Sequence, residues 1–326
     1  MSLSKSVVTA LVLVAGTGFG AHAFEPSNVE CIAPANPGGG WDFTCRQVGK
    51  TLSDLGLVPG QVQVTNMAGG GGGIAYSYVV TQRGDDPNLI VAASTATTTR
   101  LAQDQFVGLT SDQVQWVGSL GADYGAIVVA ADSPHQNLNE LVEAVIADPR
   151  SITFSGGSAA GGYDHLKVLQ VMKAAGFTDI RSIPYIAFDG GGEAVTQMLG
   201  GHVSAMTGDL SEVLGFLEAG DVRILAVLSE ERLPGEFGDL PTAVEQGLDV
   251  VSPNWRGFYI PKEAGEEAFA YWSDALNTVY ESDEWQQIMV NNGLMPFFLA
   301  GPEFQAFVED EVSGIEALSR EIGIIE

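Results

Sequence analysis

Residues 30–46 read ECIAPANPGGGWDFTCR, and the order of residue types in this stretch decides the fold. The apolar run 29–33 predicts a β-strand. The turn 37–42, which carries three glycines, follows directly, and a helix is predicted after it. A strand, a glycine-rich turn and a helix in this order form the repeating unit of layered α/β proteins.

The same alternation continues along most of the chain. Helix-period segments lie between the predicted strands at Leu138–Ala147 and 163–175, and from residue 266 onward the apolar residues recur at helical spacing only. No repeated period or low-complexity tail appears. The predicted strands are 29–33, 61–66, 89–93, 115–118, 126–131, 152–155, 204–207 and 223–229.

Three turns at strand ends are candidate binding loops: 37–42, 67–73 and 94–100. Open α/β sheets bind ligands at the carboxyl ends of their strands, where main-chain N–H groups and helix N-termini favour an anion. Further turns of this kind are predicted at 155–162, 189–192 and 207–209. A single glycine cluster is more often a tight turn, but the five consecutive glycines at 69–73 are costly to order unless something approaches closely.

The sequence offers little support for an enzyme. The glycines match neither a nucleotide-binding P-loop nor a dinucleotide fingerprint. Ala160 stands where a nucleophile elbow around Ser158 would need glycine. The four histidines form no metal-ligand pair, so His165 is interpreted as a packed or capping side chain. Asp42 is interpreted as a helix N-terminal residue that could also touch ligand or its waters. No cofactor or metal is expected.

The charge balance restricts the partners. The chain has 41 acidic and 14 basic side chains, a net charge of −27, which argues against nucleic acid and anionic lipid surfaces. Such a protein cannot attract a carboxylate through its overall field, so local donors must bind it. Arg256 and Arg100 are the cations nearest to the predicted binding turns. Both could instead form surface or interlobe ion pairs.

The N-terminal residues have the layout of a signal peptide. Lys5 precedes the apolar run 7–15, and the small-residue triplet 21–23 predicts cleavage after Ala23 and export. In an oxidising compartment the two cysteines, Cys31 and Cys45, can form a disulfide across their short loop. Two unpaired buried thiols are the alternative. The spacing of Cys31 and Cys45 matches no zinc or redox motif.

Residues 30–46 resemble the entrance loop of the solute receptors of tripartite tricarboxylate transporters, also called Bug-type receptors. The paired cysteines make them most similar to the citrate-type members. The resemblance spans nearly the whole mature chain, because weaker matches follow in the family's order at 67–73, 155–166, 184–185, 199–203 and 255–258. The chain departs from the family at 189–192, which is richer in glycine than usual, so the ligand there is expected to differ.

The resemblance implies a type II periplasmic-binding fold: two α/β lobes joined by two crossing strands, with the ligand in the cleft between them. The first lobe would comprise residues 24–126 plus 256–326, and the second residues 127–255. Family members grip a carboxylate with main-chain groups and waters from the first two loops. Together with the candidates from the turns, the predicted ligand-binding residues are Gly38, Gly39, Gly40, Trp41, Asp42, Gly70, Gly71, Gly72, Gly73, Ser94, Thr95, Thr97, Thr98, Ser155, Ser158, Asp189, Thr207, Asp209 and Arg256.

The function that the resemblance implies is capture of a small di- or tricarboxylate in the periplasm for the membrane subunits of a tripartite transporter. A monomer is expected. Two alternatives remain at this point: a receptor of the same fold that signals to a membrane sensor, and a periplasmic α/β hydrolase. The hydrolase would need a nucleophile and a base, which the sequence does not reveal.

Overall fold

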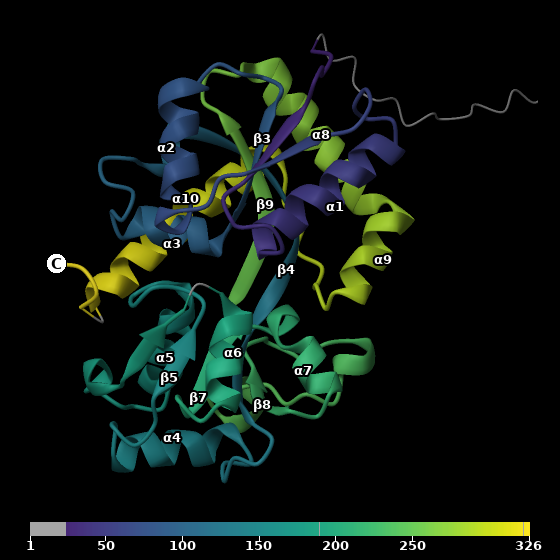
Figure 1. Ribbon diagram of the computed structural model, residues 1–326. Helices are drawn as coiled ribbons and strands as arrows, with labels where there is room; N and C mark the ends of the chain where they lie inside the picture. Colours follow the sequence, from purple (N-terminus) through teal and green to yellow (C-terminus); the bar gives the residue numbers. More distant parts are fainter. Residues whose placement is uncertain (1–23, 189, 322) are drawn as a thin grey trace, which may run out of the picture.

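The computed structural model describes residues 24–188, 190–321 and 323–326 (Figure 1), so the predicted signal peptide 1–23 lies outside the described residues. The fold is a mixed α/β structure. Its strands are β1 (Glu30–Ala33), β2 (Gln63–Asn66), β3 (Leu89–Ser94), β4 (Val114–Ala130), β5 (Phe154–Gly156), β6 (Tyr185–Ala187), β7 (Ala205–Asp209), β8 (Val222–Val227) and β9 (Pro253–Pro261). Its α-helices are α1 (Gly40–Asp54), α2 (Gly73–Gln82), α3 (Thr95–Ala102), α4 (Leu138–Ala147), α5 (Tyr163–Ala174), α6 (Gly191–Leu199), α7 (Leu214–Glu218), α8 (Glu266–Glu281), α9 (Asp283–Asn291) and α10 (Gly301–Glu321). Short 3₁₀ turns are η1 (Gly70–Gly72), η2 (Ser111–Gln113), η3 (Ile180–Ser182), η4 (Leu210–Glu212), η5 (Gly235–Phe237) and η6 (Val244–Gln246).

The strands follow the order β2-β1-β3-β9-β4-β7-β5-β6, and β8 pairs with β4. β1 is parallel to β2 and β3, and β5 is parallel to β6 and β7, whereas β9 and β4 run antiparallel to their neighbours. β4 pairs with β9 up to Tyr124 and with β7 and β8 from Gly125 onward. Figure 1 shows the elements gathered above and below this point, with β4 and β9 running between the two groups.

The long strand β4 corrects the sequence interpretation, because the predicted strands 115–118 and 126–131 are two ends of one strand of 17 residues. The glycines between them lower strand propensity. In the structure the pairing of β4 with β9 shifts register between Trp116 and Gly118 and again between Ser119 and Gly121, so glycine stands at bulges rather than at a break. β9 was not predicted, since it begins and ends with proline. The short, largely exposed β6 was not predicted either.

Both faces of the first group of strands are buried, as expected for parallel strands covered by helices on each side. Cys31 and Ile90 point toward a core formed with α1, α8 and α9, whereas Ile32 and Val91 point toward a second core formed with α2 and α10. The second group has the same layering, with α4 and α5 on one face and α6 on the other. Within the described ranges, no helix combines the length and apolarity needed to cross a membrane.

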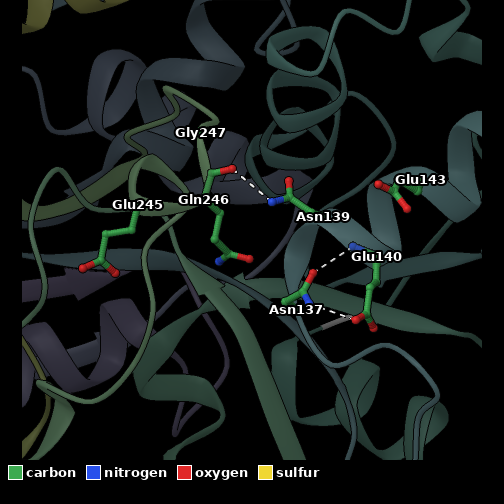
Figure 2. Close-up of a pocket in the computed structure, with 7 residues that line it drawn as sticks. All are labelled: Asn137, Asn139, Glu140, Glu143, Glu245, Gln246 and Gly247. Atoms are coloured by element: carbon green, nitrogen blue, oxygen red, sulfur yellow. Dashed lines mark hydrogen bonds between the residues drawn. The ribbon is translucent and has the colours of Figure 1, made fainter.

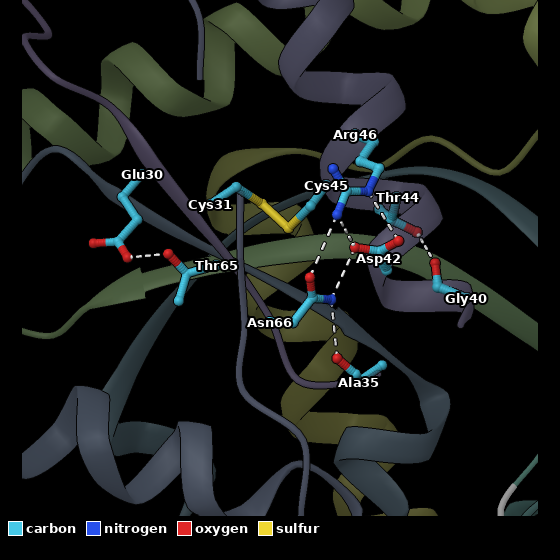
Figure 3. Close-up of a disulfide and its surroundings, with 10 residues drawn as sticks. All are labelled: Glu30, Cys31, Ala35, Gly40, Asp42, Thr44, Cys45, Arg46, Thr65 and Asn66. Carbon is cyan, nitrogen blue, oxygen red and sulfur yellow. Dashed lines mark hydrogen bonds and ion pairs between the residues drawn. A yellow bond between two sulfur atoms is a disulfide. The ribbon is translucent and has the colours of Figure 1, made fainter. Parts of the chain in front are cut away.

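The predicted disulfide is confirmed. Cys31 of β1 is bonded to Cys45 of α1, with 5.7 Å between their Cα atoms (Figure 3). Both cysteines are fully buried. Because the bond ties the first strand to the second turn of the first helix, it closes the loop that contains the glycine-rich turn.

We expect the Cys31→Ala/Cys45→Ala variant to lose about 3 kcal/mol of unfolding free energy. The bond closes a loop with a sequence separation of 14, and a crosslink of this span restricts the unfolded chain by that amount. Urea unfolding of the oxidised protein and the variant, followed by circular dichroism, measures the difference. Equal midpoints and slopes would show that the bond does not stabilise the fold.

Candidate functional site

The first turn is held together by Asp42, on the first turn of α1. Its Oδ2 accepts from the Gly38 N–H (2.8 Å) and from Arg46 Nε (2.9 Å), and its Oδ1 accepts from Asn66 Nδ2 (2.8 Å), as Figure 3 shows for Arg46 and Asn66. Burial alone would raise the pKa of Asp42, but these hydrogen bonds outweigh it and hold the pKa below its ordinary value. The side chain is therefore occupied in shaping the turn.

The N-terminus of α1 carries free main-chain donors. The first N–H groups of a helix have no partner within it, and Gly39 at the N-cap provides no side-chain cap. Gly40 is exposed, and a Cβ there would lie 2.8 Å from Nη1 of Arg256. A side chain at this position would therefore have to displace the guanidinium that lies beside the turn.

The turns after β1, β2 and β3 are brought together by Trp41. Its Nε1 donates to Ser94 Oγ (3.2 Å), which is the N-cap of α3. A Cβ on Gly72 would lie 3.4 Å from the Trp41 ring, so the glycine run packs against the same side chain. The three turns that the sequence singled out are thus neighbours in the structure.

The glycine run after β2 has a main chain that other residues rarely adopt. Gly69, Gly70, Gly71 and Gly72 have φ values of +127°, +61°, +63° and +98° in succession. Side chains with a Cβ are strained at such angles. Gly70 and Gly71 are exposed, so their main chain faces solvent at the surface of the turn. This geometry explains the composition of the run and is what a close approach to a ligand would require.

Two hydroxyl groups predicted to face a ligand instead contact α10. Thr98 Oγ1 donates to Glu311 at 2.6 Å, and Thr95 Oγ1 donates to it at 3.3 Å. Trp255 Nε1 of β9 also donates to both Glu311 oxygens, at 3.0 and 2.9 Å. Burial raises the pKa of Glu311, and the hydrogen bonds offset part of this shift. Thr97 accepts from the Ser94 N–H (3.3 Å) and completes the cap of α3.

The candidates of the second group of strands are also engaged within the protein. Ser155 Oγ donates to the Ala205 carbonyl (3.3 Å), and Thr207 Oγ1 donates to the Asp164 carbonyl (3.3 Å); both residues are fully buried. Ser158 Oγ caps α5 by accepting from the Asp164 N–H (2.9 Å). Asp189 lies outside the described residues.

A buried ionic network joins β9 to the second group of strands. Arg256 Nη2 lies 3.3 Å from Asp123 Oδ2 and 3.2 Å from Asp209 Oδ2. Lys167 of α5 lies 2.7 Å from Asp209 and 3.0 Å from Asp164, and its side chain is wholly inaccessible to solvent. The ion-pair alternative for Arg256 is thus what the structure shows. Lys167, Asp123 and Asp164 were not among the predicted site residues.

The charges of this network are unequally stabilised. Burial would raise the pKa of Asp209, but Lys167 and Arg256 lower it below its ordinary value. Burial, aided by the charge of Asp209, raises the pKa of Asp123 to about 6. Asp123 also accepts from the Ser211 hydroxyl and N–H groups. Asp209 is therefore the principal counter-ion of both cations.

His165 and Tyr185 stack on each other where the two groups of strands meet. Their ring centroids are 4.4 Å apart, and His165 Nδ1 accepts from the Gly161 N–H (2.9 Å). The Gly161 carbonyl in turn accepts from Gln103, one residue past the end of α3 (2.7 Å). Within the described residues, His165 Nε2 is buried without a hydrogen-bond partner. Burial lowers the pKa of His165 to about 4.

We expect His165 to make the protein less stable as pH falls. Its pKa is lower in the folded state than in the unfolded chain, so the unfolded chain takes up more protons below about pH 6.5. Because the ring is partly accessible, we expect a discounted cost of about 1–2 kcal/mol between pH 7 and pH 5. The difference in unfolding free energy between wild type and His165→Gln, measured at both pH values, isolates this contribution from that of Asp123. A difference that does not change with pH would contradict it.

A separate hollow lies at the start of α4, away from the three turns (Figure 2). Its lining residues already form hydrogen bonds with one another. Asn139 donates to the Gln246 carbonyl (3.1 Å), and Asn137, the N-cap of α4, accepts from the Glu140 N–H. With Glu140, Glu143 and Glu245 around it, the hollow does not suit an anion. Its lining residues are Asn137, Asn139, Glu140, Glu143, Glu245, Gln246 and Gly247.

Comparison with known proteins places the chain in a family. The family model described as "Tripartite tricarboxylate transporter family receptor" matches residues 45–324. Protein BugT of Bordetella pertussis is 26% identical over 99% of this chain and 99% of its own. A Rhodopseudomonas palustris protein solved with adipate superposes with a TM-score of 0.76 at 22% identity, covering 91% of this chain and 97% of that one. MatC from Rhodopseudomonas palustris, solved with bound malate, superposes with a TM-score of 0.74 at 21% identity, covering 89% and 98%.

These matches cover both groups of strands and confirm the α/β fold of periplasmic binding proteins that the family resemblance implies. Since the family model spans most of the chain, this protein belongs to the tripartite tricarboxylate transporter receptor family.

Proposed function

We propose that this protein is exported to the periplasm and captures a small carboxylate, a di- or tricarboxylate such as a citrate-like acid, for the membrane subunits of a tripartite transporter. The observation that carries the proposal is the convergence of the three turns after β1, β2 and β3. They are tied together through Trp41 and present main-chain N–H groups at exposed glycines. Such donors bind anions without a basic side chain.

The ligand is proposed to lie between two lobes, residues 24–126 plus 256–326 and residues 127–255. The change of pairing along β4, between Tyr124 and Gly125, supports this division because it falls close to the proposed boundary. β9 begins at the same place, because its residues from Pro253 to Arg256 pair with the part of β4 that ends at Tyr124. The ligand would be enclosed by a hinge motion at these two strands.

Two solved structures of similar fold support a carboxylate ligand, since one holds malate and the other adipate. Both are dicarboxylic acids. This chain departs from the family pattern at 189–192, which belongs to the proposed second lobe. We therefore propose that the second lobe determines which di- or tricarboxylate is bound.

Binding without chemical conversion is proposed, because the residues that could form a nucleophile and base are otherwise engaged. Ser158 Oγ caps α5, and His165 Nδ1 accepts a main-chain N–H, so neither group is directed at the other. The described residues include no group of three or more His, Cys, Asp or Glu side chains placed to hold a metal ion.

Mass spectrometry of the molecule that co-purifies with the protein tests the proposal. We expect a di- or tricarboxylic acid in about one equivalent, released by denaturation and recovered unchanged after incubation with fresh protein. A bound neutral or cationic compound would contradict carboxylate capture. Conversion of the acid to a product would favour the hydrolase alternative.

A further inference from the structure

The basic side chains beside the candidate site are neutralised, with one exception. An anion in a protein of net charge −27 needs a local positive charge that no carboxylate already holds. Most of the cations near the turns fail this condition. The neutralised ones are Arg46, paired with Asp42, Arg256, paired with Asp123 and Asp209, and Lys167, paired with Asp164 and Asp209.

Arg100, in the last turn of α3, is the exception. Throughout residues 24–188, 190–321 and 323–326, no carboxylate lies within ion-pair distance of its guanidinium, and the guanidinium donates to no group. The side chain is half-buried, and burial lowers its pKa, which marks a charge that has lost water without gaining a partner. An arginine in this state is normally paired.

The position of Arg100 connects it to the glycine run. A Cβ on Gly71 would lie 3.0 Å from Arg100 Nε, so the guanidinium lies against the exposed main chain of that glycine. Tyr185 of the proposed second lobe lies near Arg100. Gln103, three residues after Arg100, donates to the Gly161 carbonyl of the proposed second lobe. Arg100 thus lies where the glycine run and the two lobes meet.

We infer that Arg100 is a specificity-determining residue that binds a carboxylate of the ligand together with the N–H groups of the glycine run. The inference rests on the proposed function and names the charge that the main-chain donors lack. A guanidinium presents its N–H groups in a fork that matches a carboxylate. Ligand binding supplies the counter-ion that the described residues do not provide, so Arg100 favours an acid over a neutral compound of the same shape.

Isothermal titration calorimetry with succinate, malate, adipate, citrate and the half-amide succinamate tests this role. The variants are Arg100→Gln, Arg100→Lys and, as a control with the same charge change, Arg150→Gln at an exposed position after α4. For the acid that wild type binds most tightly, we expect Arg100→Gln to raise Kd about tenfold to a hundredfold. The Kd of Arg100→Lys should lie between those of wild type and Arg100→Gln, and the Kd of Arg150→Gln should stay within about twofold of the wild-type value.

Two further readouts separate this role from a structural one. Because Arg100 is unpaired, the ligand-free Arg100→Gln protein should have a Tm equal to or above that of wild type. The preference for succinate over succinamate should also shrink in Arg100→Gln. An unchanged Kd for the acid, or a lowered Tm, would overturn the assignment of Arg100 alone. Wild-type protein that binds none of the acids would overturn the proposed function, and this inference with it.

Discussion

Replacing Lys167 by methionine should lower the free energy of unfolding by about 3–5 kcal/mol. The ammonium group is wholly buried and lies 2.7 Å from Asp209 and 3.0 Å from Asp164. Its removal leaves Asp164 without its cation and Asp209 with Arg256 as its remaining cation. Breaking a buried ion pair by removing one partner is costly because the remaining charge stays buried.

The matched control for this variant lies on the same helix. Lys173→Met makes the same substitution in α5, but Lys173 pairs with Glu321 at the surface, with 42% and 61% of the two side chains exposed. Exposed pairs contribute about 0–1 kcal/mol. Urea unfolding of both variants therefore separates burial from the loss of a charge. Equal destabilisation of the two variants would show that the buried pairing of Lys167 with Asp209 and Asp164 does not stabilise the fold.

Replacing Gly71 by proline should weaken carboxylate binding about tenfold to a hundredfold. Proline removes one N–H group, and a hydrogen bond to a charged ligand contributes about 1.5–3 kcal/mol. Proline also requires φ near −65°, whereas Gly71 has φ of +63°. The change therefore removes a donor and displaces the turn that presents the neighbouring donors.

Gly71→Ala is the control that retains the N–H group. Its Cβ would be strained at this φ and would lie 3.0 Å from Arg100 Nε, so a smaller loss of affinity is expected. Calorimetric titration of both variants, after circular dichroism has confirmed their fold, measures the difference. If Gly71→Pro binds as tightly as wild type, the glycine run is only a turn.

The sequence predicted well what depends on local order. The turns after β1, β2 and β3 could be found because strand, turn and helix follow each other directly, and glycine is required where φ is positive at Gly69–Gly72. The disulfide could be predicted because Cys31 and Cys45 are close in the chain and the first residues indicate export. Each of these signals lies within a few dozen residues.

What the sequence could not show depends on contacts between distant segments. Arg256 meets Asp123 from 133 positions away, and Glu311 meets Thr98 from 213 positions away. Nothing in the local pattern distinguishes Asp123 or Glu311 from the many surface carboxylates of this chain. The same applies to Arg100, whose lack of a partner is visible only once its neighbours are known.

Small-angle scattering of the protein with and without an added acid tests the central claim most directly, because it would detect the proposed closure of two lobes around the ligand. Wild-type protein at saturating acid should show a smaller radius of gyration than ligand-free protein, and the corresponding amide should leave the profile unchanged. Superimposable profiles with and without an acid that calorimetry shows to be bound would contradict capture between two closing lobes.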